Sequence, residues 1–153
     1  MMTLKMPLNR LLNSPTKKAI AIGIFSFIGF FDASYLAIKH YTGTIPPCTI
    51  VKGCGAVTTS QYATVGGISV ALFGAIYYLV VLITAIAIID TGNNSLKKFL
   101  SFFSIIGLVA SIWFVSLQIF IINALCLYCL ASATSSFAIF AIAFFLNRQR
   151  NSA

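Results

Sequence analysis

Four cysteines fall into two pairs whose spacing permits thiol–disulfide chemistry. Cys126 and Cys129 form a C-x-x-C, and a spacing of three places both sulfurs on one face of a helix, close enough to bridge. If a helix begins here, its unpaired N–H groups and its dipole favour a thiolate by lowering the pKa of the first cysteine. A thiolate is the nucleophile that disulfide exchange requires, so this pair is a candidate redox centre.

The second pair lies in a loop. Cys48 and Cys54 flank five residues ending in Gly53, which can relieve backbone strain when the loop closes, and Pro46-Pro47 prevents a preceding helix from continuing. One pair in a loop and one at a rigid helix end indicate a relay. A zinc site using all four sulfurs and ordinary structural disulfides are the alternatives, and four cysteines allow three connectivities, among which the sequence does not choose.

The elements that must position these cysteines are membrane helices. The 153 residues are 59% hydrophobic and 8% charged, unlike a soluble domain. A bilayer crossing needs about 20 apolar residues, and four such stretches are present: about Ala19–Lys39, Gly67–Ile89, Phe99–Asn123 and Cys126–Leu146. The last two must be separate helices, because one helix from Phe99 to Leu146 would be about 72 Å long. Asn123 is the predicted turn. We therefore predict an all-α integral membrane protein, a four-transmembrane-helix bundle.

Basic residues predict the orientation of this bundle. Residues 1–18 and 147–153 form basic tails, and they share one side with the loop between the second and third helices. Eight of the ten Lys and Arg residues lie on that side: Lys5, Arg10, Lys17, Lys18, Lys97, Lys98, Arg148 and Arg150. The positive-inside rule makes that side cytoplasmic and puts the outer loop, residues 40–66, and all four cysteines on the opposite side. The charge pattern suits anionic lipid heads and shows no nucleic-acid surface.

These motifs resemble the vitamin K epoxide reductase family. The resemblance covers roughly residues 19 to 146 and rests on the order of the two cysteine pairs within four helices. Its first part is Cys48 to Cys54, Val57, Ser60, Tyr62-Ala63-Thr64, Gly67-Ile68, Gly74 and Tyr77, and its second is Cys126-Leu127-Tyr128-Cys129 with Ser132-Ala133. DsbB-type quinone reductases carry their C-x-x-C in the first outer loop, so they fit less well.

The resemblance implies a role for each cysteine. Cys48 would meet the thiol partner, Cys54 would pass electrons onward, Cys126 would receive them, and Cys129 would reduce a quinone such as ubiquinone, menaquinone or a vitamin K-type quinone. It further implies a separate thioredoxin-fold (DsbA-like) partner, an inner-membrane location with the cysteines on the periplasmic side, and disulfide formation in exported proteins. Animal members typically have Tyr where this chain has Ala133, which favours a quinone over vitamin K epoxide as the substrate.

Three further residues are weaker candidates for the quinone site. Ser60 and Asn123 can donate hydrogen bonds to a quinone carbonyl, although a cap or turn role is the favoured interpretation for Asn123. Asp32 lies inside the first predicted helix, where a carboxylate costs about 2.5–3.5 kcal/mol and should face the bundle. Asp32 either shuttles the protons of quinone reduction, makes a structural hydrogen bond to another helix, or meets water near the membrane surface.

Two other functions keep the same helices. The closest is vitamin K epoxide reduction at the same site. A small multidrug-type transporter has a similar number of helices and an acid in the first one, so it would need Asp32 and dispense with the cysteines. Turnover with quinone and the behaviour of cysteine variants separate these hypotheses.

Overall fold

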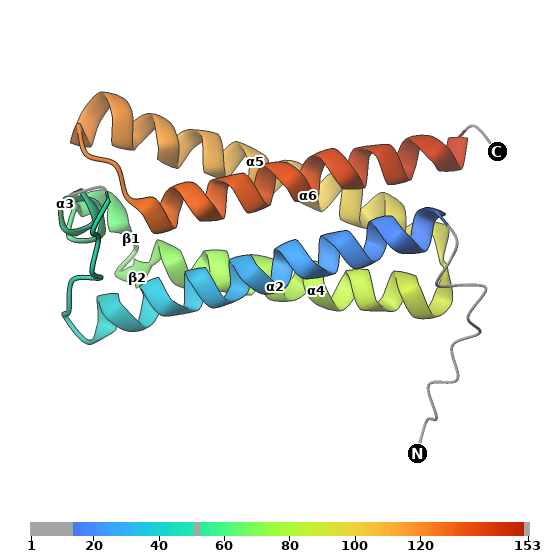
Figure 1. Ribbon diagram of the computed structural model, residues 1–153, viewed down its shortest axis with the longest axis horizontal. Coiled ribbons are helices and arrows are strands. Elements are labelled where there is room, and N and C mark those ends of the chain that lie inside the picture. Colours follow the sequence, from blue (N-terminus) through green and yellow to red (C-terminus); the bar gives the residue numbers. More distant parts are fainter. Residues whose placement is uncertain (1–13, 51–52, 152–153) are drawn as a thin grey trace, which may run out of the picture.

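The computed structural model describes residues 14–50 and 53–151, and within them four long helices form one bundle (Figure 1). These helices are α2 (Ser14–Tyr41), α4 (Val70–Thr91), α5 (Asn94–Leu117) and α6 (Leu127–Asn151). A short π-helical segment, η2 (Gln118–Ile122), extends α5. All four helices are long and apolar enough to cross a membrane. The prediction of an all-α four-helix membrane bundle is confirmed.

The segment between α2 and α4 folds into a small cap at one end of the bundle (Figure 1). It contains α3 (Cys54–Thr58), the 3-10 turn η1 (Gln61–Ala63) and two antiparallel strands, β1 (Thr64–Val65) and β2 (Ile68–Ser69). Gly66 and Gly67 link the strands with positive φ angles of 61° and 81°, which glycine adopts without steric cost. Because this hairpin uses Gly67, α4 begins at Val70, three residues after the predicted start.

Helix ends at the opposite side of the bundle also differ from the expected bounds. Helix α5 begins at Asn94 instead of Phe99, because the Asn93 side chain accepts a hydrogen bond from the Ser95 N–H at 2.9 Å and caps the helix. Lys97 and Lys98 therefore lie in its first turns. At the cap end of the bundle, the chain turns back at Asn123, as predicted, and this residue has a left-handed φ of 51°.

The core runs along the interior of the bundle and includes Ile22, Tyr78, Leu100 and Ile139. Large apolar side chains such as Phe31, Phe102 and Trp113 face outward, which suits a lipid environment. The Tyr78 hydroxyl joins α4 to α6: it donates to the Ser132 carbonyl at 2.6 Å, and its oxygen lies 2.9 Å from the Ser136 hydroxyl. This buried network fixes the helix that carries Cys129 against α4.

Candidate active site

The loop pair is joined in a disulfide. Cys48 and Cys54 are bonded, with 6.2 Å between their Cα atoms, which gives the connectivity that the sequence left open. Cys54 begins α3 and is 1% exposed, whereas Cys48 is only half-buried. Cys48 is therefore the one of these two cysteines that is easier to reach from outside.

The second pair consists of two free thiols at the start of α6. Cys126 directly precedes the helix, and its carbonyl accepts the Leu130 N–H at 3.0 Å, which makes it the N-cap residue. A hydrogen bond from the Cys129 thiol, joined by the backbone N–H groups of Cys129 and Tyr128, lowers the pKa of Cys126 from 9.0 to about 7, although burial opposes this. The first cysteine of the C-x-x-C is thus prepared to act as a thiolate.

Backbone and side-chain contacts hold the disulfide loop against the C-x-x-C segment. The Tyr128 hydroxyl donates to the Pro47 carbonyl at 3.3 Å, one residue before Cys48. Gly53, one residue before Cys54, packs directly on the backbone of Leu125, with no space for a side chain. Each loop cysteine is therefore preceded by a residue that touches the segment around Cys126. The two pairs lie at the same end of the bundle, where Cys48 and Cys54 belong to the cap and Cys126 and Cys129 lie beside it at the start of α6.

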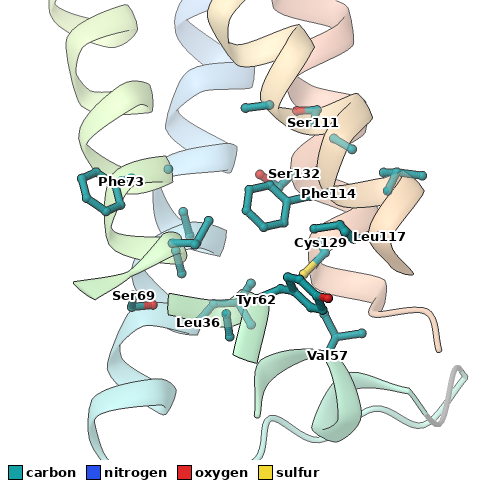
Figure 2. Close-up of a pocket in the computed structure, with 18 of the residues that line it drawn as sticks. Leu36, Val57, Tyr62, Ser69, Phe73, Ser111, Phe114, Leu117, Cys129 and Ser132 are labelled. Atoms are coloured by element: carbon teal, nitrogen blue, oxygen red, sulfur yellow. The ribbon is translucent and has the colours of Figure 1, made fainter. Parts of the chain in front are cut away.

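A cavity of about 520 Å³ lies beside the free thiols. Its walls come from α2, the cap, α4, α5 with η2, and α6, and Figure 2 shows the Cys129 side chain pointing towards Tyr62, with Phe114 and Ser132 above it. Most of its lining is apolar, including Leu36, Phe73 and Leu117. The volume falls within the roughly 300–1,000 Å³ of small-molecule sites. Cys129 is the cysteine that meets this cavity.

The structure divides the weaker candidates. Ser60 lines the cavity, and its hydroxyl donates to the Val57 carbonyl at 2.8 Å. Asn123 is exposed and does not line the cavity, and its left-handed backbone forms the chain reversal between η2 and α6. Asp32 does not line the cavity either.

A family model for the vitamin K epoxide reductase family matches residues 20–144. The chain belongs to this family. A comparison with curated proteins finds no match. Membership makes the protein a membrane oxidoreductase that works through cysteines, which agrees with the free thiol pair and the disulfide-bonded pair described above. With Cys48 and Cys54 bonded to each other, two sulfurs stay free, whereas a structural zinc site uses four ligands.

Asp32 is the acid nearest to the redox centre of this family member. It interacts electrostatically with Cys126 and Cys129, and one of its carboxylate oxygens, Oδ2, is buried without a hydrogen-bond partner among the described residues. The carboxylate faces the bundle, as expected from the cost of exposing it to lipid. The structural hydrogen bond considered for Asp32 is not formed by this oxygen.

Gln118 was missed by the sequence reasoning. Its side chain is 1% exposed, and its Oε1 accepts the Cys126 N–H at 2.9 Å. It also contributes to the cavity wall. A glutamine within an apolar run eight residues before a C-x-x-C was the available signal, because a buried amide in a membrane helix needs a partner.

Proposed function

We propose that this member of the family transfers electrons from a reduced thioredoxin-fold protein, through its two cysteine pairs, to a membrane quinone. The observation that carries this proposal is the placement of the four cysteines between the outside of the cap and the cavity. Cys48 is partly accessible, Cys54 and Cys126 are buried, and Cys129 meets the cavity. This order supports a path from an outside donor to an apolar acceptor.

The chemistry is two successive thiol–disulfide exchanges. A thiolate of the partner attacks Cys48, and Cys54 leaves as a thiolate. The partner's second thiol then attacks this mixed disulfide, which releases Cys48 as a thiol and leaves the partner with a disulfide. Cys54 attacks Cys126 of a Cys126–Cys129 disulfide, and Cys129 leaves as a thiolate. Cys48 then attacks Cys54, which restores the Cys48–Cys54 disulfide and releases Cys126, so that Cys126 and Cys129 are both reduced. This last state, a bonded loop pair beside two thiols, corresponds to the structure.

Oxidation of the Cys126–Cys129 pair completes the cycle. Two electrons and two protons leave the pair, the Cys126–Cys129 disulfide forms, and a quinone becomes a quinol. The cavity fits such a substrate, because its lining is mostly apolar and it reaches Cys129. The chain supplies the binding surface and the thiols, and the quinone supplies the oxidant.

Quinone, and not vitamin K epoxide, is the substrate that we propose. Ala133 lines the cavity at the position where animal members of the family typically have Tyr. An alanine removes a phenol from the cavity wall and leaves space for a ring, and it provides no hydroxyl to donate a proton to an epoxide oxygen. Turnover of the two substrates by the same preparation tests this choice.

Of the three weaker candidates, we propose that Ser60 contacts the quinone and that Asp32 handles protons. Ser60 lies in the cavity wall, and the electrostatic interaction of Asp32 with both free thiols suits transfer of their protons. An Asp32→Asn variant should reduce quinone at least about 100-fold more slowly, the lower end of general acid–base effects. Unchanged turnover would leave Asp32 with no part in proton transfer.

We propose that the cap lies on the periplasmic side of an inner membrane, where it would support disulfide formation in exported proteins. In Figure 1, the start of α2 and the end of α6 lie at the same end of the bundle, away from the cap. Lys17, Lys18, Lys97 and Lys98 lie in helix turns at that end, whereas Lys39 lies near the cap. The positive-inside rule assigns the lysine-rich end to the cytoplasm.

The test is quinone reduction by the purified protein, with each cysteine changed to Ser in turn. Cys126→Ser and Cys129→Ser should stop turnover with every donor. Cys48→Ser and Cys54→Ser should stop turnover with a reduced thioredoxin-fold protein but retain it with a small dithiol. Ser116→Ala is a matched control, because its hydroxyl only donates to the Ile112 carbonyl of its own helix. If wild type reduces no quinone, or the four variants match it, the proposal fails.

A further inference from the structure

Both oxygens of Gln118, the main-chain carbonyl and the side-chain Oε1, accept hydrogen bonds from the turn that ends at Cys126. Its main-chain carbonyl accepts the N–H groups of Asn123 and Ala124, the latter at 3.1 Å. Its side-chain Oε1 accepts the Cys126 N–H at 2.9 Å, and both partners of this bond are buried. One residue thus binds three of the four amides between Asn123 and Cys126.

The hydrogen bond to Cys126 fills a place that a helix leaves open. An N-cap residue has an N–H that finds no partner inside the helix, and in a capping box a Glu or Gln at the third helical position accepts it. That position in α6 is Cys129, whose side chain serves the redox pair instead. Gln118 provides the missing acceptor from the preceding helix. Without it, a buried N–H would stay unpaired beside the reactive sulfur.

We propose that Gln118 is a positioning residue that holds Cys126 at the N-cap of α6, so that the Cys126 sulfur stays over the first N–H groups of that helix. This inference deepens the function proposed above, because it concerns the same thiol. It adds a residue of α5 to the machinery of a pair that belongs to α6.

The groups around Cys126 determine what a lost hydrogen bond would change. Asp32 of α2 interacts electrostatically with Cys126, and Cys129 and Tyr128 lie on α6 itself. The lowered pKa of Cys126 arises from its hydrogen bond with the Cys129 thiol and from the N–H groups of Cys129 and Tyr128. All three hydrogen bonds depend on the position of the Cys126 sulfur at the N-cap, so they weaken when the sulfur moves away from it. Release of Cys126 should therefore raise its pKa.

The experiment measures the rate of Cys126 alkylation against pH, in the form with Cys48 and Cys54 bonded. Fragment masses separate the Cys126 product from the Cys129 product. In Gln118→Met, which keeps the length of the side chain but removes its carbonyl, a pKa near 7 should move to near 8. The thiolate fraction at pH 7 then falls about fivefold. Gln118→Asn keeps the amide but is one methylene shorter, so it should behave likewise. Ser116→Ala should match wild type.

A second measurement does not depend on any variant folding. Hydrogen exchange of the wild-type Cys126 amide should be slowed well below the rate of an unstructured peptide, because that N–H is bonded and buried. Exchange at the unstructured rate, or pH profiles of both Gln118 variants that coincide with wild type, would overturn the proposal. Neither measurement requires a quinone or a partner protein. A failed relay with a slow Cys126 amide would therefore reject the proposed function and leave the role of Gln118 intact.

Discussion

Gly53 offers the sharpest test of how the two cysteine pairs communicate. It precedes Cys54 and lies directly on the backbone of Leu125, so a Cβ atom at this position would overlap the Leu125 main chain. Its φ of −101° and ψ of −4° are accessible to alanine. Gly53→Ala therefore introduces a steric clash without backbone strain, and it acts only on the contact between the loop and the C-x-x-C segment.

The size of the effect follows from the packing. Leu125 main-chain atoms cannot move away as a flexible side chain would, so relief requires the loop to shift. Overpacking of this kind costs about 1–3 kcal/mol. If the whole cost opposes the docked position of Cys54, the docked population relative to the undocked one falls about 5- to 140-fold. Electron transfer from the loop pair to Cys126 should slow by a similar factor.

The assay compares quinone reduction driven by a reduced thioredoxin-fold protein with reduction driven by a small dithiol that reaches Cys126–Cys129 directly. Gly53→Ala should slow the first reaction and spare the second. Gly55→Ala is the matched control, because its Cβ would meet the Ile45 side chain at 3.2 Å, and that side chain can move. Equal turnover of both glycine variants with the protein donor would refute the argument that this contact aligns the pairs.

Three further predictions concern the same end of the bundle. Tyr128→Phe removes one exposed hydrogen bond to the cap, and protein-driven turnover should fall about two- to tenfold. Tyr78→Phe should destabilise the protein by about 1–3 kcal/mol in detergent unfolding, because it leaves buried α6 groups unpaired, whereas Tyr77→Phe should be neutral, since the described residues offer its hydroxyl no partner. The lowered pKa of Cys126 stabilises the reduced fold above pH 9 and loses this effect as pH falls towards 7, so the melting temperature of the reduced protein relative to Cys126→Ser should rise between these values.

Periodic and compositional signals were enough to predict the helices. The four apolar stretches and the turn at Asn123 were correctly identified, because length and hydrophobicity alone define a membrane span. The start of α4 was displaced by three residues. Gly66 and Gly67 read equally well as the beginning of an apolar run or as a hairpin, and pairing of Thr64 with Ser69 decides for the hairpin.

The arrangement of the site required the three-dimensional structure. The sequence named both cysteine pairs but not the contact between Gly53 and Leu125, because residues 72 positions apart approach only after four helices have packed. It also gave no reason to join Gln118 to Cys126, since the π-helical turn that aims the Gln118 side chain has no clear sequence signature. Local patterns thus revealed the chemistry, and the long-range contacts determine its order.

The hydroxyl groups of the cavity lead to an expectation about substrate range. Ser60 and Tyr78 both donate to main-chain carbonyls, whereas the Tyr77 hydroxyl, which also belongs to a residue of the cavity wall, has no hydrogen-bond partner among the described residues and keeps its proton for a quinone oxygen. Binding then rests on one such hydrogen bond and on the apolar wall, which contributes roughly 25 cal/mol per Å² of buried apolar surface and is not directional. We expect benzoquinones and naphthoquinones of similar tail length to give KM values within about tenfold of each other, because one hydrogen bond to a neutral group is worth about 0.5–1.5 kcal/mol. A preference above a hundredfold would mean that Ser60 or Tyr78 changes its hydrogen-bond partner when quinone binds, and loss of that preference in Ser60→Ala or in Tyr78→Phe would identify which one.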